Sequence, residues 1–120
     1  MSLIAKNVDT GTIVADRVSV AATRASRRTG LLDRESLEPG EALWIVPSRG
    51  VHTIGMRFAI DLVALDDTGV VIDRVTELRP WRIRLPRRGT AGVLELPVGA
   101  LEQSRTAMGH RILFVRDNET

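Results

Sequence analysis

The chain is 120 residues long, with 43% hydrophobic and 27% charged residues and a formal net charge of +2. This length suffices for one hydrophobic core but not for a second independent unit, so we expect a single domain over residues 1–120. Because the chain contains no cysteine, its composition excludes a disulfide, a thiolate nucleophile and a sulfur-ligated zinc site.

The hydropathy pattern of the chain indicates where in the cell the protein is expected. No segment approaches the roughly 18 to 20 consecutive apolar residues that span a bilayer, which predicts no membrane span. Residues 1–16 lack a basic region followed by an apolar stretch, so no signal peptide is expected. A cytoplasmic location is the resulting expectation.

The basic residues are almost all arginines, since Lys6 is the only lysine among seventeen. The planar guanidinium fork suits carboxylates and phosphates, and arginines are dense between residues 74 and 88. The chain offers few aromatic side chains for base stacking and no recognisable nucleic-acid motif, so nucleic-acid binding is not favoured.

The first half of the chain predicts two strands and a short helix. β-Branched residues mark a strand over 13–21. Residues 23–29 suit a short helix that Gly30 closes, because glycine adopts the left-handed conformation common at helix C-termini. A short strand over 42–46 is ended by Pro47.

The central segment predicts a β-hairpin. An apolar run over 56–65 and a second over 70–78 flank the turn 66–69, which ends in glycine. Two strand-like runs joined by a short glycine-containing loop are typical of antiparallel neighbours.

The remaining chain predicts three short strands, a helical turn and a frayed tail. Apolar residues alternate with arginines over 81–85, as in an exposed edge strand. Further strands are expected over 91–96 and 111–115, a helical turn over 101–105, and a frayed tail over 117–120. About seven short strands and one or two brief helices predict a mostly β (α+β) domain, built as a curled sheet or small barrel.

Asp61 is the first candidate site residue because it interrupts the apolar run of the central strand. An unpaired charge in apolar surroundings costs several kcal/mol, so its carboxyl needs a partner. Alternation along a strand places Asp61 on the same side as Arg57, but roughly 13 Å away. A structural role, in which Asp61 ties down a loop, and a catalytic role both remain open.

Glu95 is the second candidate, flanked by Leu94 and Leu96 in an apolar strand. If Glu95 met Asp61, repulsion between the two carboxylates would raise one pKa and create an acid–base pair. A pairing of Glu95 with one of the arginines at 82–88 is the alternative.

Histidine offers two further candidates, His52 and His110. Their spacing matches no common metal-binding motif, so no metal site is expected. His52, next to Thr53, suits hydrogen bonding or proton transfer, or it caps a turn. Ser48 lies nearby but lacks the glycines of a nucleophile elbow.

Several ordered blocks stand out along the chain, at 28–34, 37–43, 51–61, 65–66, 69–72, 80–82 and 93–99. Together they resemble the domain of unknown function 192 family, over residues 21–114. The resemblance implies a compact, mostly β fold and a shared site around His52, Met56, Asp61 and Glu95. It implies no activity, because none is firmly assigned to the family, and many relatives look exported.

Three interpretations follow. The leading one is a binding module whose polar pocket receives a small anionic or polar ligand or a protein partner, without a cofactor. The second is a hydrolase-like enzyme with Asp61 or Glu95 as general base and His52 as acid. The third is a purely structural polar network. The candidate ligand-binding residues are His52, Thr53, Met56, Arg57, Asp61, Arg82 and Glu95.

Overall fold

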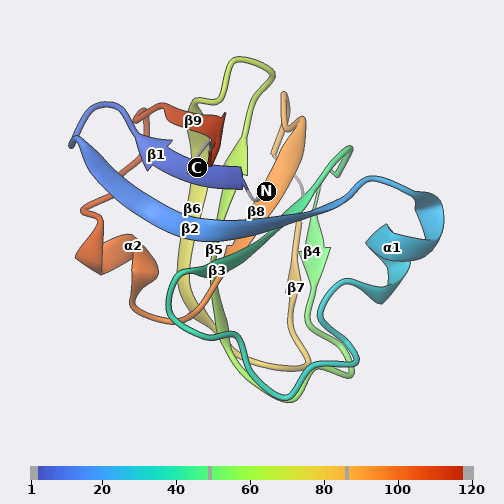
Figure 1. The fold of residues 1–120 in the computed structure, drawn as a ribbon. Helices are drawn as coiled ribbons and strands as arrows, with labels where there is room; N and C mark the ends of the chain where they lie inside the picture. The colour runs from blue at the N-terminus through green and yellow to red at the C-terminus, as the bar shows by residue number, and fades with distance from the viewer. Residues whose placement is uncertain (1–2, 49, 86, 118–120) are drawn as a thin grey trace.

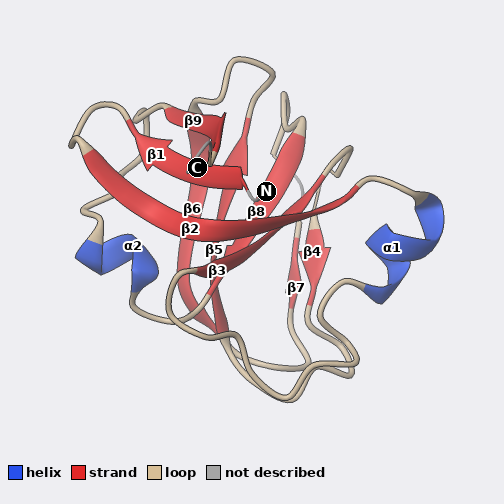
Figure 2. Ribbon diagram, in the orientation of Figure 1, coloured by secondary structure: helices blue, strands red, loops and turns tan. Residues whose placement is uncertain are grey.

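The computed structural model describes residues 3–48, 50–85 and 87–117. Within them the chain forms nine strands and two short helices, which confirms the expected mostly β class (Figure 2). Their bounds are β1 (Leu3–Asn7), β2 (Thr12–Ala21), α1 (Arg24–Thr29), β3 (Glu41–Ile45), β4 (Val51–His52), β5 (Ile60–Leu65), β6 (Val71–Leu78), β7 (Ile83–Arg84), β8 (Gly92–Leu96), α2 (Ala100–Gln103) and β9 (Ile112–Arg116).

Seven strands form one curled sheet in the order β6-β5-β8-β3-β2-β1-β9. Neighbours pair antiparallel except β2 and β3, which are parallel. The sheet curls until its two edge strands approach each other (Figure 1). There the Val71 N–H donates to the His110 carbonyl and the Ile112 N–H to the Gly69 carbonyl, both at 2.8 Å. The result is a half-barrel with a short hydrogen-bonded seam.

A second, two-stranded sheet joins β4 to β7, with Val51 opposite Arg84 and His52 opposite Ile83. It is tied to the main sheet by a bidentate ion pair, in which Arg84 donates to both oxygens of Asp73 on β6 at 2.8 and 2.9 Å. A planar guanidinium and a carboxylate fit each other in this geometry. The small sheet therefore has a fixed position against β6.

The main sheet is buried on both faces along β5 and β8, whose every residue is buried. One face fills the half-barrel with a cluster that includes Val63, Leu94 and Leu96. The other face lies under Leu31, Met56 and their neighbours in a second cluster. Strands covered on both sides read as continuous apolar runs, and so the acids that interrupt them need explanation.

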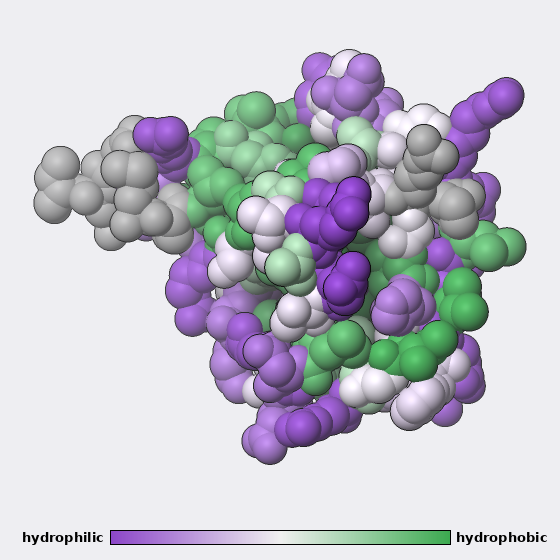
Figure 3. Space-filling model, turned by 90° about the vertical axis from the view of Figure 1, so that its right-hand side faces the viewer, coloured by the Kyte–Doolittle hydropathy of each residue, from purple (hydrophilic) through white to green (hydrophobic). Residues whose placement is uncertain are grey.

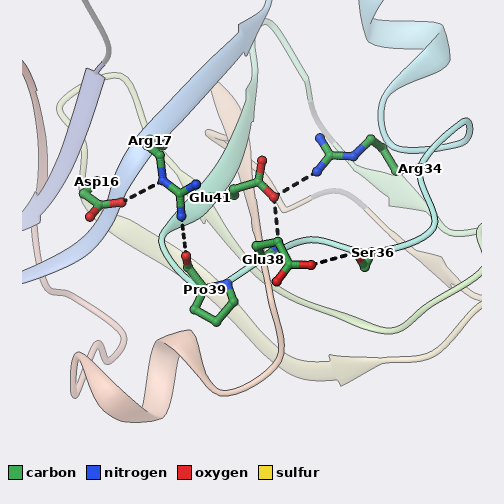
Figure 4. Close-up of polar contacts among 7 residues, drawn as sticks. All are labelled: Asp16, Arg17, Arg34, Ser36, Glu38, Pro39 and Glu41. Atoms are coloured by element: carbon green, nitrogen blue, oxygen red, sulfur yellow. Dashed lines mark hydrogen bonds and ion pairs between the residues drawn. The ribbon is translucent and has the colours of Figure 1, made fainter.

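The connection from α1 to β3 is held by a local polar network (Figure 4). Glu41 accepts hydrogen bonds from Arg34 at 2.9 Å and from the Glu38 N–H at 2.8 Å. These bonds lower the pKa of Glu41, the backbone donor contributing most. The loop thereby holds buried Leu37 in the second cluster.

The short helix α1 begins and ends as the sequence predicts. Thr23 and Ser26 form a reciprocal capping box at its start, which satisfies amides that the first turn leaves free. Gly30 ends the helix at the expected position, but with φ 48° and ψ −122° its backbone is not in the expected left-handed helical conformation. The two helices lie on opposite sides of the molecule in Figure 2, α1 following β2 and α2 following β8.

Two strands are markedly shorter than expected, whereas the other expected strand bounds are off by one residue. The strand expected over 56–65 begins only at Ile60, because Gly55 turns the chain with φ 85° and the Met56 N–H bonds back to the Thr53 carbonyl. The expected edge strand over 81–85 pairs only at Ile83–Arg84. Residues 118–120 of the expected frayed tail lie outside the described residues.

Candidate functional site

A cavity of about 150 Å³ opens between α1, the loop before β4 and the outer face of the main sheet. Its walls come from residues 27–32 at the end of α1, from the segment around Ser48 and His52, and from Met56. Glu95 of β8 also lines it. An engineered apolar cavity of similar size holds a benzene molecule, so this space suits a ligand of a few heavy atoms.

Glu95 reaches this cavity from the middle of β8, where Leu43 and Leu62 flank it on the neighbouring strands. The residue is 3% exposed. It makes no hydrogen bond or ion pair with any described residue, although the chain has many arginines. Burial alone raises the pKa of Glu95 to about 7, because a low-dielectric environment disfavours the charged form.

Glu95 lines the cavity, and its carboxyl has no protein partner among the described residues. In the described part of the chain, every side-chain nitrogen or oxygen atom that is inaccessible to solvent has a hydrogen-bond partner. An unpartnered carboxyl must therefore keep some contact with the cavity. Among the deeply buried acids of the described sheet, Glu95 is the one whose carboxyl has no protein hydrogen-bond partner and could accept one from a ligand.

Basic side chains stand at the rim of the cavity. The Arg27 guanidinium donates to the Ala22 carbonyl at 2.6 Å, which anchors it to the start of α1. Arg28 is exposed and has no hydrogen-bond or ion-pair partner among the described residues. His52 is exposed on β4, and the Ser48 hydroxyl is turned to the Gly50 carbonyl at 3.0 Å. Figure 3 shows hydrophilic side chains in the middle of this face, beside hydrophobic surface.

Asp61 does not join this site. It lies opposite Leu96 on β8, whereas Leu62 lies opposite Glu95, and successive residues of a strand face opposite sides. Asp61 instead accepts three backbone N–H bonds, from Glu77 at 2.9 Å, Gly99 at 3.0 Å and Leu101 at 3.2 Å. The carboxyl thus fixes the start of α2, and the hypothetical acid–base pair between Asp61 and Glu95 is not formed.

Three other expected ligand-binding residues also lie outside the cavity lining. Thr53 is fully buried, and its hydroxyl donates to the Arg79 carbonyl at 2.6 Å and accepts from the Arg82 N–H at 2.9 Å. Arg57 is exposed and pairs with Glu35 at 3.4 Å, and Arg82 is exposed. Thr53 therefore joins two chain segments, while His52, Met56 and Glu95 come together at the cavity.

The arginines between residues 74 and 88 are largely explained by structure. Arg84 and Arg87 face Asp73 at 2.8 and 3.6 Å, and Arg74 donates to the Thr106 carbonyl at 2.7 Å. Two of the arginines at 82–88 are thus taken by Asp73, and none of the described ones pairs with Glu95.

His110 lies at the seam of the half-barrel, away from the cavity lining. Its Nδ1 is 3.1 Å from the Asn7 amide nitrogen and accepts the Ala107 N–H at 3.1 Å. Within residues 3–48, 50–85 and 87–117 no three histidine, aspartate or glutamate side chains gather as metal ligands would. In the same ranges no helix has the length and apolar character needed to cross a membrane.

Comparison with known protein families shows to which family the chain belongs. The family model of domain of unknown function 192, described as "Uncharacterized ACR", matches residues 5–114. The chain belongs to this family. The match begins sixteen residues before Ala21, the start of the resemblance expected from the sequence, and it takes in residues 5–7 of β1 and all of β2.

Relatives of this family member include two archaeal proteins named UPF0127. That of Pyrococcus abyssi is 32% identical over 105 residues, covering 82% of this chain and 86% of the relative. That of Pyrococcus horikoshii is 32% identical over 101 residues, covering 79% and 84%. Neither name states an activity.

Two solved structures share the fold of this family member. One, from Sinorhizobium meliloti, is named as a candidate transcription regulator; it superposes with a TM-score of 0.81 at 18% identity and covers 93% of this chain and 91% of its own. The other, a protein of unknown function from Novosphingobium aromaticivorans, has a TM-score of 0.78 at 19% identity, covering 92% and 82%. At these identities the likeness concerns the fold alone.

The α1 wall is the part of the site that sequence reasoning missed. Arg27 and Arg28 belong to a stretch of basic residues that scattered arginine usage explains equally well. The available signal was position. Arg28 is the first residue of the block 28–34 that carries the family resemblance, and Arg27 directly precedes it.

Proposed function

We propose that this protein is a small binding module that holds a polar ligand in the cavity over Glu95. The single observation that carries the proposal is a carboxyl that is 3% exposed, has no protein partner and lines an open cavity. Buried polar groups are nearly always hydrogen-bonded. A ligand that bonds to Glu95 would supply the missing partner.

The dimensions of the cavity favour a small molecule over a protein surface. A volume of about 150 Å³ accommodates a few heavy atoms, and its lining combines apolar Leu31 and Met56 with polar side chains that could orient a ligand. A protein partner would have to insert a single side chain or chain end.

Thermal unfolding in the presence of a compound library tests the proposal. A compound at about 100 times its dissociation constant adds roughly 2.7 kcal/mol of apparent stability. The expected result is a rise in melting temperature with wild-type protein and with Glu102→Gln, a change at an exposed acid on α2. The rise should disappear with Glu95→Gln. Stabilisation that survives Glu95→Gln would place binding elsewhere.

Acid–base catalysis is a second candidate function, favoured by one specific observation. Burial raises the pKa of Glu95 to about 7, which suits a general acid or base near neutral pH, and His52 lines the same cavity. Turnover of a compound that binds in a Glu95-dependent manner, followed by product analysis, would distinguish an enzyme from a binding module.

A further inference from the structure

The cavity is lined by residues of opposite charge and different depth, and this asymmetry restricts the chemistry of its ligand. Glu95, which is 3% exposed, is its buried acid and defines the buried end. Arg27 and the exposed Arg28 of α1 also line it and define the outer end. This inference rests on the proposed function and concerns the class of ligand at the same site.

The buried end favours a cationic donor. No arginine or lysine among the described residues pairs with Glu95, so the carboxylate has no countercharge of its own. A carboxylate in such surroundings is stabilised most by a charged donor that satisfies its oxygens and its charge together. An ammonium group is small enough to meet Glu95 in a cavity of about 150 Å³.

The outer end favours an anion. Arg28 is exposed and unpartnered among the described residues, and it follows Arg27, whose guanidinium is anchored to the Ala22 carbonyl. A guanidinium binds a carboxylate through two parallel hydrogen bonds. An anionic group on a ligand could bond to Arg28 without displacing any protein contact.

We infer that the ligand is a small zwitterion of the amino-acid class, with its ammonium group on Glu95 and its carboxylate at the arginine rim formed by Arg27 and Arg28. A ligand with only a negative charge would repel the Glu95 carboxylate unless Glu95 took up a proton. A plain amine would satisfy Glu95 but leave the arginine rim unused.

Isothermal titration calorimetry with matched compounds tests this inference. Glycine, β-alanine and 4-aminobutyrate vary the separation between the two charges, while propylamine and propionate each carry only one of them. At least one zwitterion should bind at least tenfold more tightly than both single-charge compounds. The ammonium group requires ionised Glu95, and the pKa of Glu95 is about 7. The affinity for the zwitterion should therefore rise about tenfold from pH 6 to pH 8.

Matched variants test the two ends separately. Glu95→Gln should abolish zwitterion binding, whereas Glu102→Gln should retain it. Arg28→Gln should weaken the zwitterion at least fivefold and leave propylamine unchanged. Arg24→Gln is the control for it, because Arg24 lies on the same helix but outside the cavity lining.

The outcomes separate this inference from the proposed function. Tight binding of propionate that weakens toward pH 8, or Glu95-dependent binding of neutral compounds alone, would overturn the zwitterion and leave the binding module in place. A library and a zwitterion series that both lack Glu95-dependent binding would overturn the two together.

Discussion

Glu95 and Asp61 are acids of neighbouring strands, and the surroundings of each carboxyl decide its role. Both are almost completely buried, at 3% and 1% exposure. Asp61 accepts three backbone N–H bonds, which give both of its carboxyl oxygens partners inside the protein. Glu95 has no such donors, and burial raises its pKa to about 7. The first acid therefore holds the fold together, while the second is the group on which the proposed ligand site depends.

The raised pKa of Glu95 predicts an unusual dependence of stability on pH. The folded state binds the Glu95 proton more tightly than the unfolded state, whose pKa stays near 4.5, so this group destabilises the fold as pH rises from 4.5 to 7. Glutamine has no proton to lose. The stability of Glu95→Gln relative to wild type should thus increase by about 2 kcal/mol between pH 5 and pH 8, at 1.36 kcal/mol per pKa unit.

Urea unfolding at both pH values measures this change. Glu102→Gln serves as the control, because an exposed acid should shift stability little and similarly at both pH values. Parallel stability profiles for Glu95→Gln and wild type would mean that the carboxyl is hydrated and ordinary.

At the scale of elements, the ion pair between β6 and β7 holds the small sheet that presents His52. Asp73 has 5% side-chain exposure and Arg84 has 38%. Arg84→Gln leaves a buried carboxylate without its bidentate partner, and we expect a loss of about 1 to 3 kcal/mol at pH 7. Arg88→Gln, at an exposed arginine nearby, should cost far less in the same urea unfolding experiment.

The pH dependence of the Arg84 effect has a definite sign. The hydrogen bonds from Arg84 are the main cause that lowers the pKa of Asp73 from 3.8. The stabilisation is therefore present above pH 3.8 and lost as pH falls through the lower, folded-state pKa. A gap between wild type and Arg84→Gln that stays constant below pH 3.8 would contradict this assignment.

Most elements could be predicted from sequence because their signals are local. Gly30 and the Thr23 cap mark α1, and apolar runs bounded by turn residues mark β6 and β8. Two strands were missed for a physical reason. β1 (Leu3–Asn7) and β4 (Val51–His52) are short, and they are stabilised by pairing with β2, β9 and β7 rather than by their own residue pattern. Tertiary pairing of this kind leaves little trace in a short segment.

At the scale of the whole molecule, the site was only partly predictable because register between strands is not a local property. Alternation within β5 and within β8 shows which residues share a face of each strand, but a shift of one residue between the strands exchanges the faces. The observed register places Leu62, not Asp61, opposite Glu95. Sequence therefore identified both buried acids and His52, while the three-dimensional register separated Asp61 from the other two.

Closure of the half-barrel provides the last prediction, which concerns the seam between β6 and β9. Gly69 has φ +88°, and a Cβ there would lie 2.5 Å from the Ile112 carbonyl oxygen, the chain segment that completes the seam. Gly69→Ala should cost about 2 to 4 kcal/mol, since overpacking adds to the backbone strain of a positive φ. Gly89→Ala is the matched control, because Gly89 has the same φ with no atom within 4 Å of the added Cβ.

Hydrogen exchange shows whether the loss arises at the seam. The Val71 and Ile112 amides donate across it, so their exchange should accelerate in Gly69→Ala more than in Gly89→Ala. Because β5, β8 and Glu95 lie on the far side of β6 from the seam in strand order, a ligand bound over Glu95 should still stabilise Gly69→Ala. Equal destabilisation by the two alanine variants would show that the hydrogen bonds of the seam contribute little to the free energy of unfolding. The curvature of the sheet would then depend on its other strand pairings.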